Sequence, residues 1–483
     1  MRIKIVPVPS VWRDDGQGEA MIDSLGSPEA ETIYPIPAVR RHGRPRDLFT
    51  VWFGSNLMML TIVTGALSTT VFGQPLLPAV LALLVGNLIG AIFMALHAAQ
   101  GPRLGVPQMV QTRGQFGLMG AVPVTAVIVL MYVGFAASNL VLGAEGLQSI
   151  LPGLGRLPAI LVIQTLSILP AILGYRMIHV SAQVMTLLCG IAVIFCIWRV
   201  LVLHGGELPL LASGPIHWTG ILRTLSTAAL WQIAYAPYVS DASRYLPSGP
   251  AGERRAFICC FSGSVLGSML PMGLGAAVGL LATGHGIVGT LTRLLGPWAV
   301  AVLVALSLGI AVANAMNVYC GTLSSLTVAQ TFTPDRHYGR TSRVAVTVAL
   351  LVLAFAMATL MADSFMITYS EFLELLMSVM IPWTAINLTD YYLLHHGDYD
   401  VASFFKRDGG RYGLYNAPAL VCYVIGILVQ APFLSTALYT GQVARALGGV
   451  DLSWVVSLIL TPPLYIAMTR RFNPRLIPRH GVR

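Results

Sequence analysis

The residues with the clearest chemical potential are uncharged polar and aromatic side chains that interrupt long apolar stretches. Phe135 and Asn139 are four residues apart, so on a helix they share one face. Asn314 and Asn317 interrupt a second apolar stretch. An amide both donates and accepts hydrogen bonds, and an aromatic ring stacks on a flat heterocycle. This combination favours the binding of a neutral planar ligand.

Two further stretches combine such groups with helix breakers. Breakers free backbone groups, which is how many membrane transporters bind a ligand near the middle of the bilayer. The first stretch contains Gly54, Ser55, Asn56, Thr61, Thr64 and Gly65, and the second contains Ser226, Thr227, Trp231, Gln232, Tyr235 and Pro237. None of the four stretches has a charged residue at its centre, which disfavours an ionic ligand. For each amide alone, a hydrogen bond between helices stays open as the alternative.

The elements that must position these residues are membrane-spanning helices. Of the 483 residues, 55% are hydrophobic and 10% are charged, whereas about 25% of the residues in soluble proteins are charged. This composition excludes a soluble enzyme, a secreted disulfide scaffold and a disordered chain. A bilayer is spanned by about 20 apolar residues. Twelve spans are predicted, at residues 49–72, 76–96, 118–142, 157–173, 182–203, 221–239, 256–282, 297–327, 344–361, 369–394, 417–439 and 452–468.

The net charge of +9 arises from 29 Lys and Arg against 20 Asp and Glu. The cations lie in short connections between apolar stretches rather than on a soluble face, which disfavours a nucleic-acid partner. Cation-rich and cation-poor connections alternate, and the cation-rich ones, with Arg113, Arg244 and Arg343 among them, are assigned to the cytoplasm. Both termini are therefore expected in the cytoplasm, with membrane lipid as a secondary partner.

The sequence contains no motif of an ATP-driven pump or a membrane protease. GxxxxGK[ST], HExxH and GxSxG are all missing from it. His395 and His396 adjoin at a helix end, where we expect a solvated pair rather than metal ligands. The sequence thus predicts no enzyme activity, no cofactor and no metal site. A channel and a secondary transporter are the main classes left.

Four separated motifs, in order, resemble the purine-cytosine permease branch of the nucleobase:cation symporter-1 family. They lie at residues 47–67, 101–117 (GPRLGVPQMVQTRGQFG), 238–247 (YVSDASRYLP) and 382–400 (PWTAINLTDYYLLHHGDYD). The resemblance implies an all-α integral membrane protein with 12 transmembrane helices. It also implies a LeuT-like five-plus-five inverted repeat, discontinuous helices 1 and 6, and alternating access. The expected parts are a cytoplasmic N-terminal tail (1–46), a ten-helix transport core (47–395), helices 11 and 12 (396–470) and a cytoplasmic C-terminal tail (471–483).

That family holds its substrate with residues of helices 1, 3, 6 and 8, and the resemblance carries this site over to the polar clusters above. It implies stacking by Phe135 and Trp231, amide hydrogen bonds from Asn139 and Asn317, and a hydroxyl contact from Ser55, with Gln232 and Asn314 beside them.

The coupling ion is expected to be a proton. The sodium-coupled hydantoin transporter of the family uses adjacent hydroxyl residues early in helix 8, where this sequence has Ala311, Val312 and Ala313. Methyl groups offer sodium no oxygen ligand, so sodium is disfavoured. The candidates for coupling or gating are Glu145, Asp241, Arg244, Glu371 and Glu374. An interfacial carboxylate, or for Asp241 with Arg244 a helix-end salt bridge, stays open as the alternative.

The sequence therefore predicts a multi-pass secondary active transporter of the plasma (cytoplasmic) membrane that imports cytosine or a purine by symport with protons. A permease for allantoin, hydantoin or a vitamin precursor is the alternative within the family. A channel or a receptor-like membrane protein is a more distant alternative.

Overall fold

The computed structural model describes residues 32–41, 43–204, 216–282, 286–362, 365–436 and 439–473. Regular structure in these ranges is helical, with one isolated bridge between Ser435 and Thr440. In the same ranges, seven helices are long and apolar enough to cross a membrane, or eight spans if one bent pair counts as a span. Each of the twelve predicted spans overlaps a helix or a broken pair of helices. The all-α class is confirmed, while the number twelve stays a prediction.

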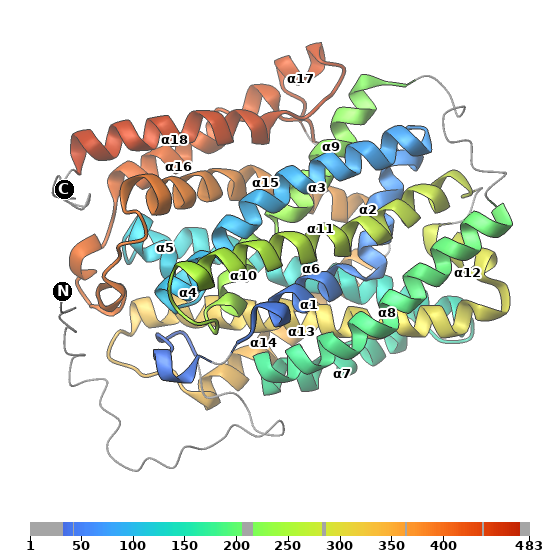
Figure 1. Ribbon diagram of the computed structural model, residues 1–483, viewed down its shortest axis with the longest axis horizontal. Helices are drawn as coiled ribbons and strands as arrows, with labels where there is room; N and C mark the ends of the chain where they lie inside the picture. The colour runs from blue at the N-terminus through green and yellow to red at the C-terminus, as the bar shows by residue number, and fades with distance from the viewer. Residues whose placement is uncertain are drawn as a thin grey trace.

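Most helices run along the long axis of the molecule (Figure 1). The α-helices are α1 Pro45–Asn56, α2 Met59–Thr70, α3 Leu76–Ala98, α4 Gln100–Leu104, α5 Gln108–Phe116, α6 Ala121–Ile150, α7 Arg156–Leu173, α8 Tyr175–His204, α9 Trp218–Ile233, α10 Ala236–Ser243, α11 Pro250–Leu280, α12 Ile287–Leu295, α13 Ala299–Phe332, α14 Arg340–Met361, α15 Phe365–Thr389, α16 Ala417–Leu428, α17 Gln442–Ala446 and α18 Ser453–Phe472. The shorter helical segments are η2 Ala38–Arg40, η4 Gly296–Trp298, η6 Asp390–Leu394, η7 Val401–Phe405, η8 Gly410–Tyr412 and η9 Ala431–Phe433. In Figure 1, α4 and α5 lie at one end of the molecule and α12 at the other.

Two spans are broken, as the resemblance predicts for helices 1 and 6. α1 and α2 meet at a bend of 58°, and the intervening Met58 is extended. The side chains before this bend bond to the backbone of α1, Ser55 to the Val51 carbonyl at 2.7 Å. Such side-chain bonds compete with the helical ladder. α9 ends at Ile233 and α10 begins at Ala236, with Pro237, which has no backbone N–H, in its first turn.

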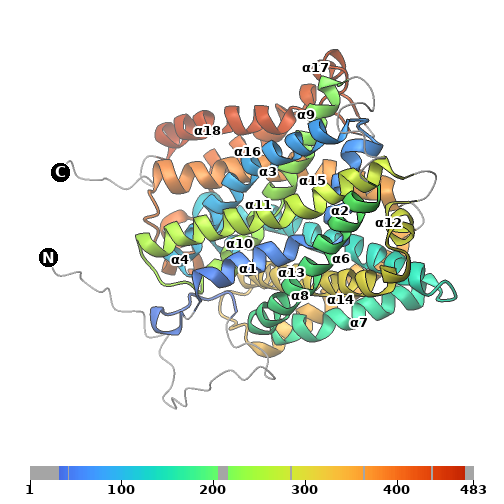
Figure 2. The same ribbon diagram turned by 45° about the vertical axis from the view of Figure 1, so that its right-hand side comes forward.

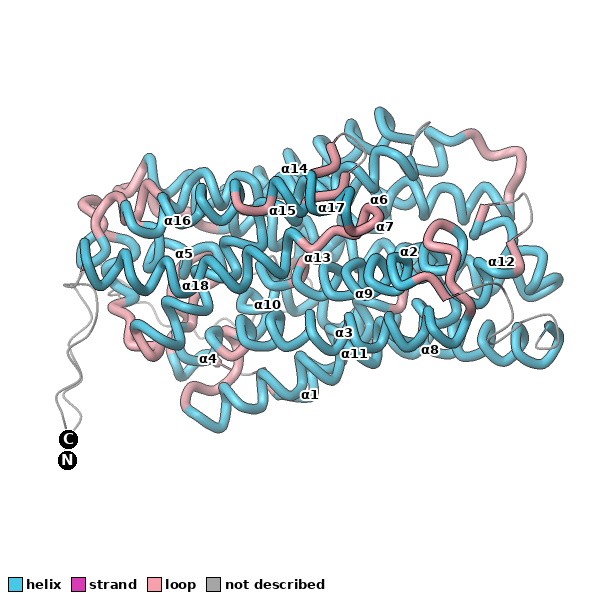
Figure 3. Tube along the Cα trace, turned by 90° about the horizontal axis from the view of Figure 1, so that it is seen from above, coloured by secondary structure: helices cyan, strands magenta, loops and turns pink. Residues whose placement is uncertain are grey.

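The helices form two main groups. α1, α2, α3, α9, α10 and α11 pack on one another, and α6, α7, α8, α13 and α14 form the second group. Figure 3 shows α3 and α11 side by side in the first group. Within it, a Cβ on Gly65 of α2 would collide with the backbone of Met272 on α11, so glycine allows this close crossing. Each group takes helices from both halves of the chain, which a five-plus-five repeat predicts; the repeat itself stays a prediction.

α16 and α18 lie along one edge of the molecule, and α7 and α14 along the opposite edge (Figure 2). α18 packs against α15 and α16. The helices of the predicted spans 11 and 12 are therefore peripheral.

The predicted span 417–439 is longer than its helix, and several connections are more structured and more buried than their sequences indicate. Residues 101–117, one of the four motifs, carry α4 and α5, and every residue of α5 is buried. Of the cations assigned to cytoplasmic connections, Arg113, Arg244 and Arg343 are at most 1% exposed, since the protein packs around them. The predicted span 417–439 is an α-helix only as far as Leu428. An unpredicted helix, α12, precedes α13 and is too short to span a bilayer.

Candidate functional site

A cavity lies where the two broken spans meet α6 and α13. Its walls come from both sides of each break and from the middle of the two unbroken helices. It is lined by Trp52, Ser55, Met58, Leu60, Phe135, Asn139, Trp231, Ala234, Tyr235, Tyr238, Ala313, Met316 and Asn317. No side chain of this lining carries a formal charge, so the cavity suits an uncharged ligand.

Five of the seven predicted binding residues line this cavity. They are Ser55, Phe135, Asn139, Trp231 and Asn317. They come from four helices that are distant in the sequence, so the fold brings together what the sequence only suggested. Their roles toward a ligand stay predictions.

The other two predicted residues, Gln232 and Asn314, do not line the cavity. Consecutive side chains on a helix point about 100° apart. Trp231 points into the cavity, and Gln232 therefore points toward the neighbouring helices instead. Its amide donates to Asn87 at 2.6 Å and to Ser268 at 2.7 Å, which ties α9 to α3 and α11. Asn314 is 1% exposed, and neither atom of its amide has a hydrogen-bond partner within the described ranges.

The polar groups of the cavity divide into paired and unpaired ones. The Trp231 indole N–H donates to the Asn56 side-chain oxygen at 2.8 Å, so the fold already uses it. The Tyr238 hydroxyl donates to Oδ1 of Asn317 at 2.8 Å, which leaves the Asn317 NH₂ to donate to a ligand. Oδ1 of Asn139 is buried without a partner among the described residues, so it is an open acceptor. The cavity therefore offers one amide donor and one amide acceptor.

Aromatic rings form much of the remaining wall. The rings of Trp52 and Tyr235 meet at 5.7 Å and those of Trp231 and Tyr235 at 5.9 Å, both edge to face. Phe135 meets Phe372 of α15 edge to face at 5.5 Å. These contacts fix the ring planes before any ligand arrives.

Sequence reasoning missed Trp52, Tyr238 and the part played by Asn56. Trp52 lies on α1 one turn before Ser55, so helical spacing from Ser55 indicates it. Tyr238 lies just past Pro237. It belongs to the motif at residues 238–247, which begins at the end of the predicted span 221–239. Nothing in the sequence shows that Asn56 bonds to Trp231, because 175 residues separate them.

Two of the coupling and gating candidates, Asp241 and Arg244, lie next to each other at the end of α10. Asp241 is buried on α10, where its Oδ1 accepts the backbone N–H of Gln108, the first residue of α5, at 2.8 Å. Arg244 is buried beside it and donates to the Thr32 carbonyl at 2.6 Å and to the Tyr319 hydroxyl at 3.2 Å.

Two of the glutamates among these candidates, Glu145 and Glu371, are not part of the cavity lining. Glu145 on α6 is exposed and Glu371 on α15 is partly buried. The side chain of Glu374 lies outside the described residues.

Ala313, in the segment where the sequence comparison predicts that a sodium site is missing, lies beside the first break. Ala313 lines the cavity. One turn earlier, a Cβ on Gly309 would lie 3.4 Å from the Leu57 carbonyl oxygen, so this face of α13 packs on the bend between α1 and α2. The methyl group of Ala313 therefore lies on the face of α13 that is turned toward the broken span.

Most of the chain is similar in sequence to known membrane permeases. Residues 35–457 match the family model described as permease for cytosine/purines, uracil, thiamine, allantoin. The chain belongs to this permease family. A *Bacillus subtilis* relative, the putative purine-cytosine permease YxlA, is 35% identical over 467 residues, which cover 94% of this chain and 98% of the relative. The purine-cytosine permease fcyB of *Emericella nidulans* is 22% identical and covers 87% of this chain and 84% of its own.

Solved structures give the fold of this permease. Mhp1, a nucleobase-cation-symport-1 family transporter in a closed conformation with bromovinylhydantoin bound, matches with a TM-score of 0.70 at 17% identity. The match covers 94% of this chain and 98% of Mhp1. The inward-facing conformation of Mhp1 matches with a TM-score of 0.69. The resemblance to the nucleobase:cation symporter-1 family is thus confirmed, and the protein is a multi-pass membrane permease.

A first prediction concerns the bond that joins the two breaks. Trp231→Phe keeps an aromatic ring but leaves the Asn56 oxygen buried and unpaired, which costs about 1–3 kcal/mol. We expect a lower thermal unfolding midpoint for the purified permease. Because both groups belong to one bond, the double variant with Asn56→Ala should lose less than the sum of the single losses. If the stability losses of Trp231→Phe and Asn56→Ala simply add up in the double variant, the two breaks are not coupled through this bond.

Proposed function

We propose that this permease imports a neutral planar nucleobase, cytosine or a purine, by symport with protons. The observation that carries the proposal is the uncharged cavity at the two breaks, with one free amide acceptor and one amide donor between aromatic walls. The names of the *Bacillus* and *Emericella* relatives support the same substrate class. A base has donors and acceptors along its edge and two apolar faces, so it matches this lining.

Each cavity residue then has a role. The base lies between the rings of Phe135 and Trp231, and its edge bonds to the Oδ1 of Asn139 and the NH₂ of Asn317. The hydroxyl of Ser55 donates to its own helix, so its oxygen acts as an acceptor. Since the cavity spans both breaks, a bound base bridges helices from the two groups, which gives it a means of biasing their relative position.

Proton coupling is supported by the residues opposite the first break. Ala311 and Ala313 provide no oxygen ligand for sodium, whereas the buried Asp241 is a group that a proton can neutralise. We further propose an orientation with both termini in the cytoplasm of a plasma-membrane protein, and the division into tails (1–46 and 471–483), core (47–395) and two outer helices (396–470). The ends of both tails lie outside the described residues.

A second candidate substrate is allantoin or a hydantoin. It is favoured by one observation, that Mhp1 shares the fold and its structure holds bromovinylhydantoin. The two classes have similar size and polarity, so competition experiments rather than geometry separate them.

The test is uptake of labelled cytosine, adenine, uracil and allantoin by cells that express the permease. We expect cytosine or a purine to accumulate, a protonophore to abolish accumulation, and replacement of sodium by choline to leave uptake within about twofold of its original rate. Uptake that requires sodium contradicts proton coupling. Uptake that never exceeds the external concentration favours a channel over a symporter.

A further inference from the structure

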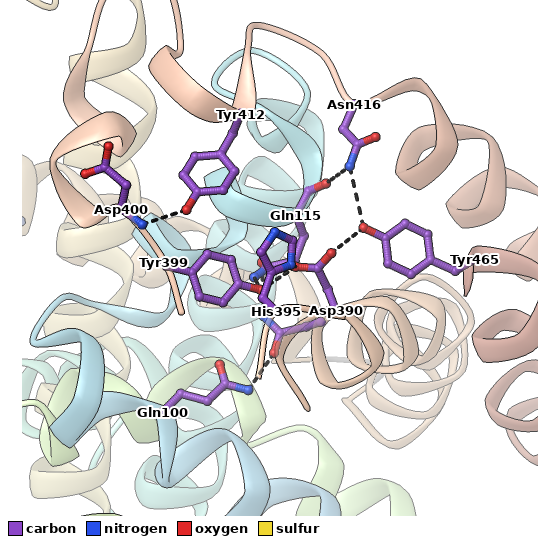
Figure 4. Close-up of polar contacts among 10 residues, drawn as sticks. Gln100, Gln115, Asp390, His395, Tyr399, Asp400, Tyr412, Asn416 and Tyr465 are labelled. Atoms are coloured by element: carbon purple, nitrogen blue, oxygen red, sulfur yellow. Dashed lines mark hydrogen bonds and ion pairs between the residues drawn. The ribbon is translucent and has the colours of Figure 1, made fainter. Parts of the chain in front are cut away.

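A second buried polar site lies away from the cavity, where η6 continues α15. Asp390, the first residue of η6, is 1% exposed. Its Oδ2 accepts the hydroxyl of Tyr465 at 2.6 Å, and its Oδ1 accepts the hydroxyl of Tyr399 (Figure 4). Each oxygen of this carboxyl group thus has a hydroxyl donor, and hydrogen bonds of this kind favour a carboxylate.

The cation nearest to this carboxylate is an imidazole. Nδ1 of His395 lies 2.9 Å from Oδ1 of Asp390, and both side chains are at most 1% exposed. The ring stacks on Tyr399 at 4.6 Å. The prediction of a solvated His395–His396 pair is therefore wrong for His395, while His396 is exposed.

The local backbone explains this burial. The His395 N–H donates to the Asp390 carbonyl at 2.8 Å, a bond between residues five apart, so η6 is a π-helical turn. Such a turn brings residue 395 back over residue 390, which an α-helix does not do. Short π-helical turns occur frequently at functional sites.

The surroundings leave the imidazole as the group that titrates near neutral pH. The titratable and charged groups that face it are Asp390 from η6, Tyr399, Arg411 and Tyr412 from the following segment, and Tyr465 from α18, while α5 contributes the neutral Gln115. Burial lowers the pKa of His395, but the Asp390 carboxylate outweighs this and holds the pKa above its usual value. Nε2 of His395 is buried without a partner in the described part of the chain, so it is a position where a proton can be exchanged.

A chain of amides leads away from the pair. The donors all point in one direction: Gln108 to Gln100 at 3.3 Å, Gln100 to Asn387 at 2.8 Å, Asn387 to Gln115 at 3.2 Å, Gln115 to Tyr399 at 3.1 Å, and Tyr399 to Asp390. The chain joins α4, α5, α15 and η6, and the last acceptor in it is the Asp390 carboxyl group. It begins beside Asp241, which accepts the backbone N–H of Gln108.

The same helix reaches the substrate cavity. α15 carries Phe372, whose ring contacts Phe135 of the cavity lining, and it is followed directly by Asp390. A change in the contacts of η6 is therefore transmitted to α15, which contacts the cavity lining through Phe372.

We propose that Asp390 and His395 form a proton-binding site through which the proton concentration on the α4–α5 side controls how fast the permease opens there. This inference rests on the proposed function, which places that side in the cytoplasm. With His395 protonated, the pair is neutral and joins η6 to α5 and α18. With His395 neutral, the buried charge of Asp390 is uncompensated, which weakens the contacts of η6 with α5 and α18. Opening is therefore faster at alkaline pH.

The test is exchange of labelled cytosine in proteoliposomes with the same pH on both sides, which removes the driving force of a gradient. We expect wild-type exchange to rise at least about threefold between about pH 6 and pH 8, as the imidazole titrates. His395→Gln should lack this rise. The matched control His396→Gln, a change at the neighbouring exposed imidazole, should keep it. A rise that persists in His395→Gln overturns the inference.

Tyr465→Phe gives a second test that keeps both members of the pair. Loss of one donor leaves more charge on Asp390, which then holds the His395 proton more tightly. We expect the midpoint of the pH profile to move to higher pH. An unchanged midpoint contradicts a proton site at the pair, because a purely structural tyrosine changes the rate without moving the midpoint.

Thermal unfolding keeps this inference separate from the proposed function. The folded-state pKa of His395 is raised, so its stabilising effect is present at low pH and is lost as the pH rises above 6.5 and through the folded pKa. The wild-type unfolding midpoint should therefore fall over this range relative to that of His395→Gln. If no base is carried at any pH, the proposed function fails while this comparison still decides the proton site. If the unfolding midpoints of wild type and His395→Gln change with pH in parallel, the proton site is overturned.

Discussion

Replacing Asn139 and Asn317 together by alanine is expected to lower nucleobase uptake about a hundredfold, because each lost hydrogen bond to a desolvated ligand costs about tenfold. Asn139 supplies the open acceptor of the cavity and Asn317 the open donor. Each single variant should lose about tenfold. The measurement is the initial rate of uptake of labelled base, normalised to the amount of folded permease in the membrane.

The matched control is Ser138→Ala on the same helix. Ser138 is buried next to Asn139, but its hydroxyl donates to the Gly134 carbonyl of its own helix at 2.9 Å and does not line the cavity. This variant should transport within about twofold of wild type. Near-normal uptake by the double asparagine variant contradicts the assignment of the cavity.

The second large effect is expected at Arg113, where Arg113→Met should destabilise the permease by about 3 kcal/mol or more. Its guanidinium donates to the carbonyls of Thr327 and Phe404 and to the side chains of Gln330 and Thr331, at 2.5 to 2.9 Å. These bonds tie α5 to the end of α13 and to η7. Methionine fills a similar volume but removes all four donated bonds, and of the four acceptors the Thr327 carbonyl still accepts the Thr331 hydroxyl at 3.1 Å. The measurement is the thermal unfolding midpoint of the purified protein.

Two comparisons test this account of Arg113. Arg113→Lys keeps the charge but loses the planar fork, so it should fall between wild type and the methionine variant. Arg103→Met removes a partly exposed arginine that bonds to the Gly397 carbonyl and pairs with Glu253 at 3.6 Å, and it should cost less than about 1 kcal/mol. Equal losses at Arg103 and Arg113 contradict a special role for the buried guanidinium.

The breaks of the two discontinuous spans could be predicted because their signals are local. Gly54, Ser55 and Asn56 precede the first break, and Pro237 follows the second. Backbone-bonding side chains and a missing N–H act on their own helix whatever the rest of the fold does. The positions of Phe135 and Asn139 on one face follow equally from helical geometry, and five of the seven predicted binding residues line the cavity.

The buried cations could not be predicted in the same way. Arg113, Arg244 and Arg343 have the sequence context of orientation signals, in short segments between apolar spans. Their burial depends on carbonyls and side chains far along the chain, such as Thr327 for Arg113 and Thr32 for Arg244. A positive charge in a connection therefore indicates the side of the membrane, but it does not show whether water or protein surrounds it.

The sequence alone determined the membrane class, the approximate positions of the apolar helices, the two breaks and the uncharged character of the groups that line the cavity, because hydropathy and helix breaking depend on neighbouring residues. The tertiary structure decided which polar groups are free to bind. Asn317 has only its NH₂ left for a ligand, because the Tyr238 hydroxyl donates to its oxygen. The amide of Gln232 donates instead to Asn87, which is 145 residues away in the sequence. It also decided that His395 is buried against Asp390, since that requires a π-helical turn and the ring of Tyr399. Hydrogen-bond partners distant in the sequence leave no local pattern, and they set the chemistry of both sites.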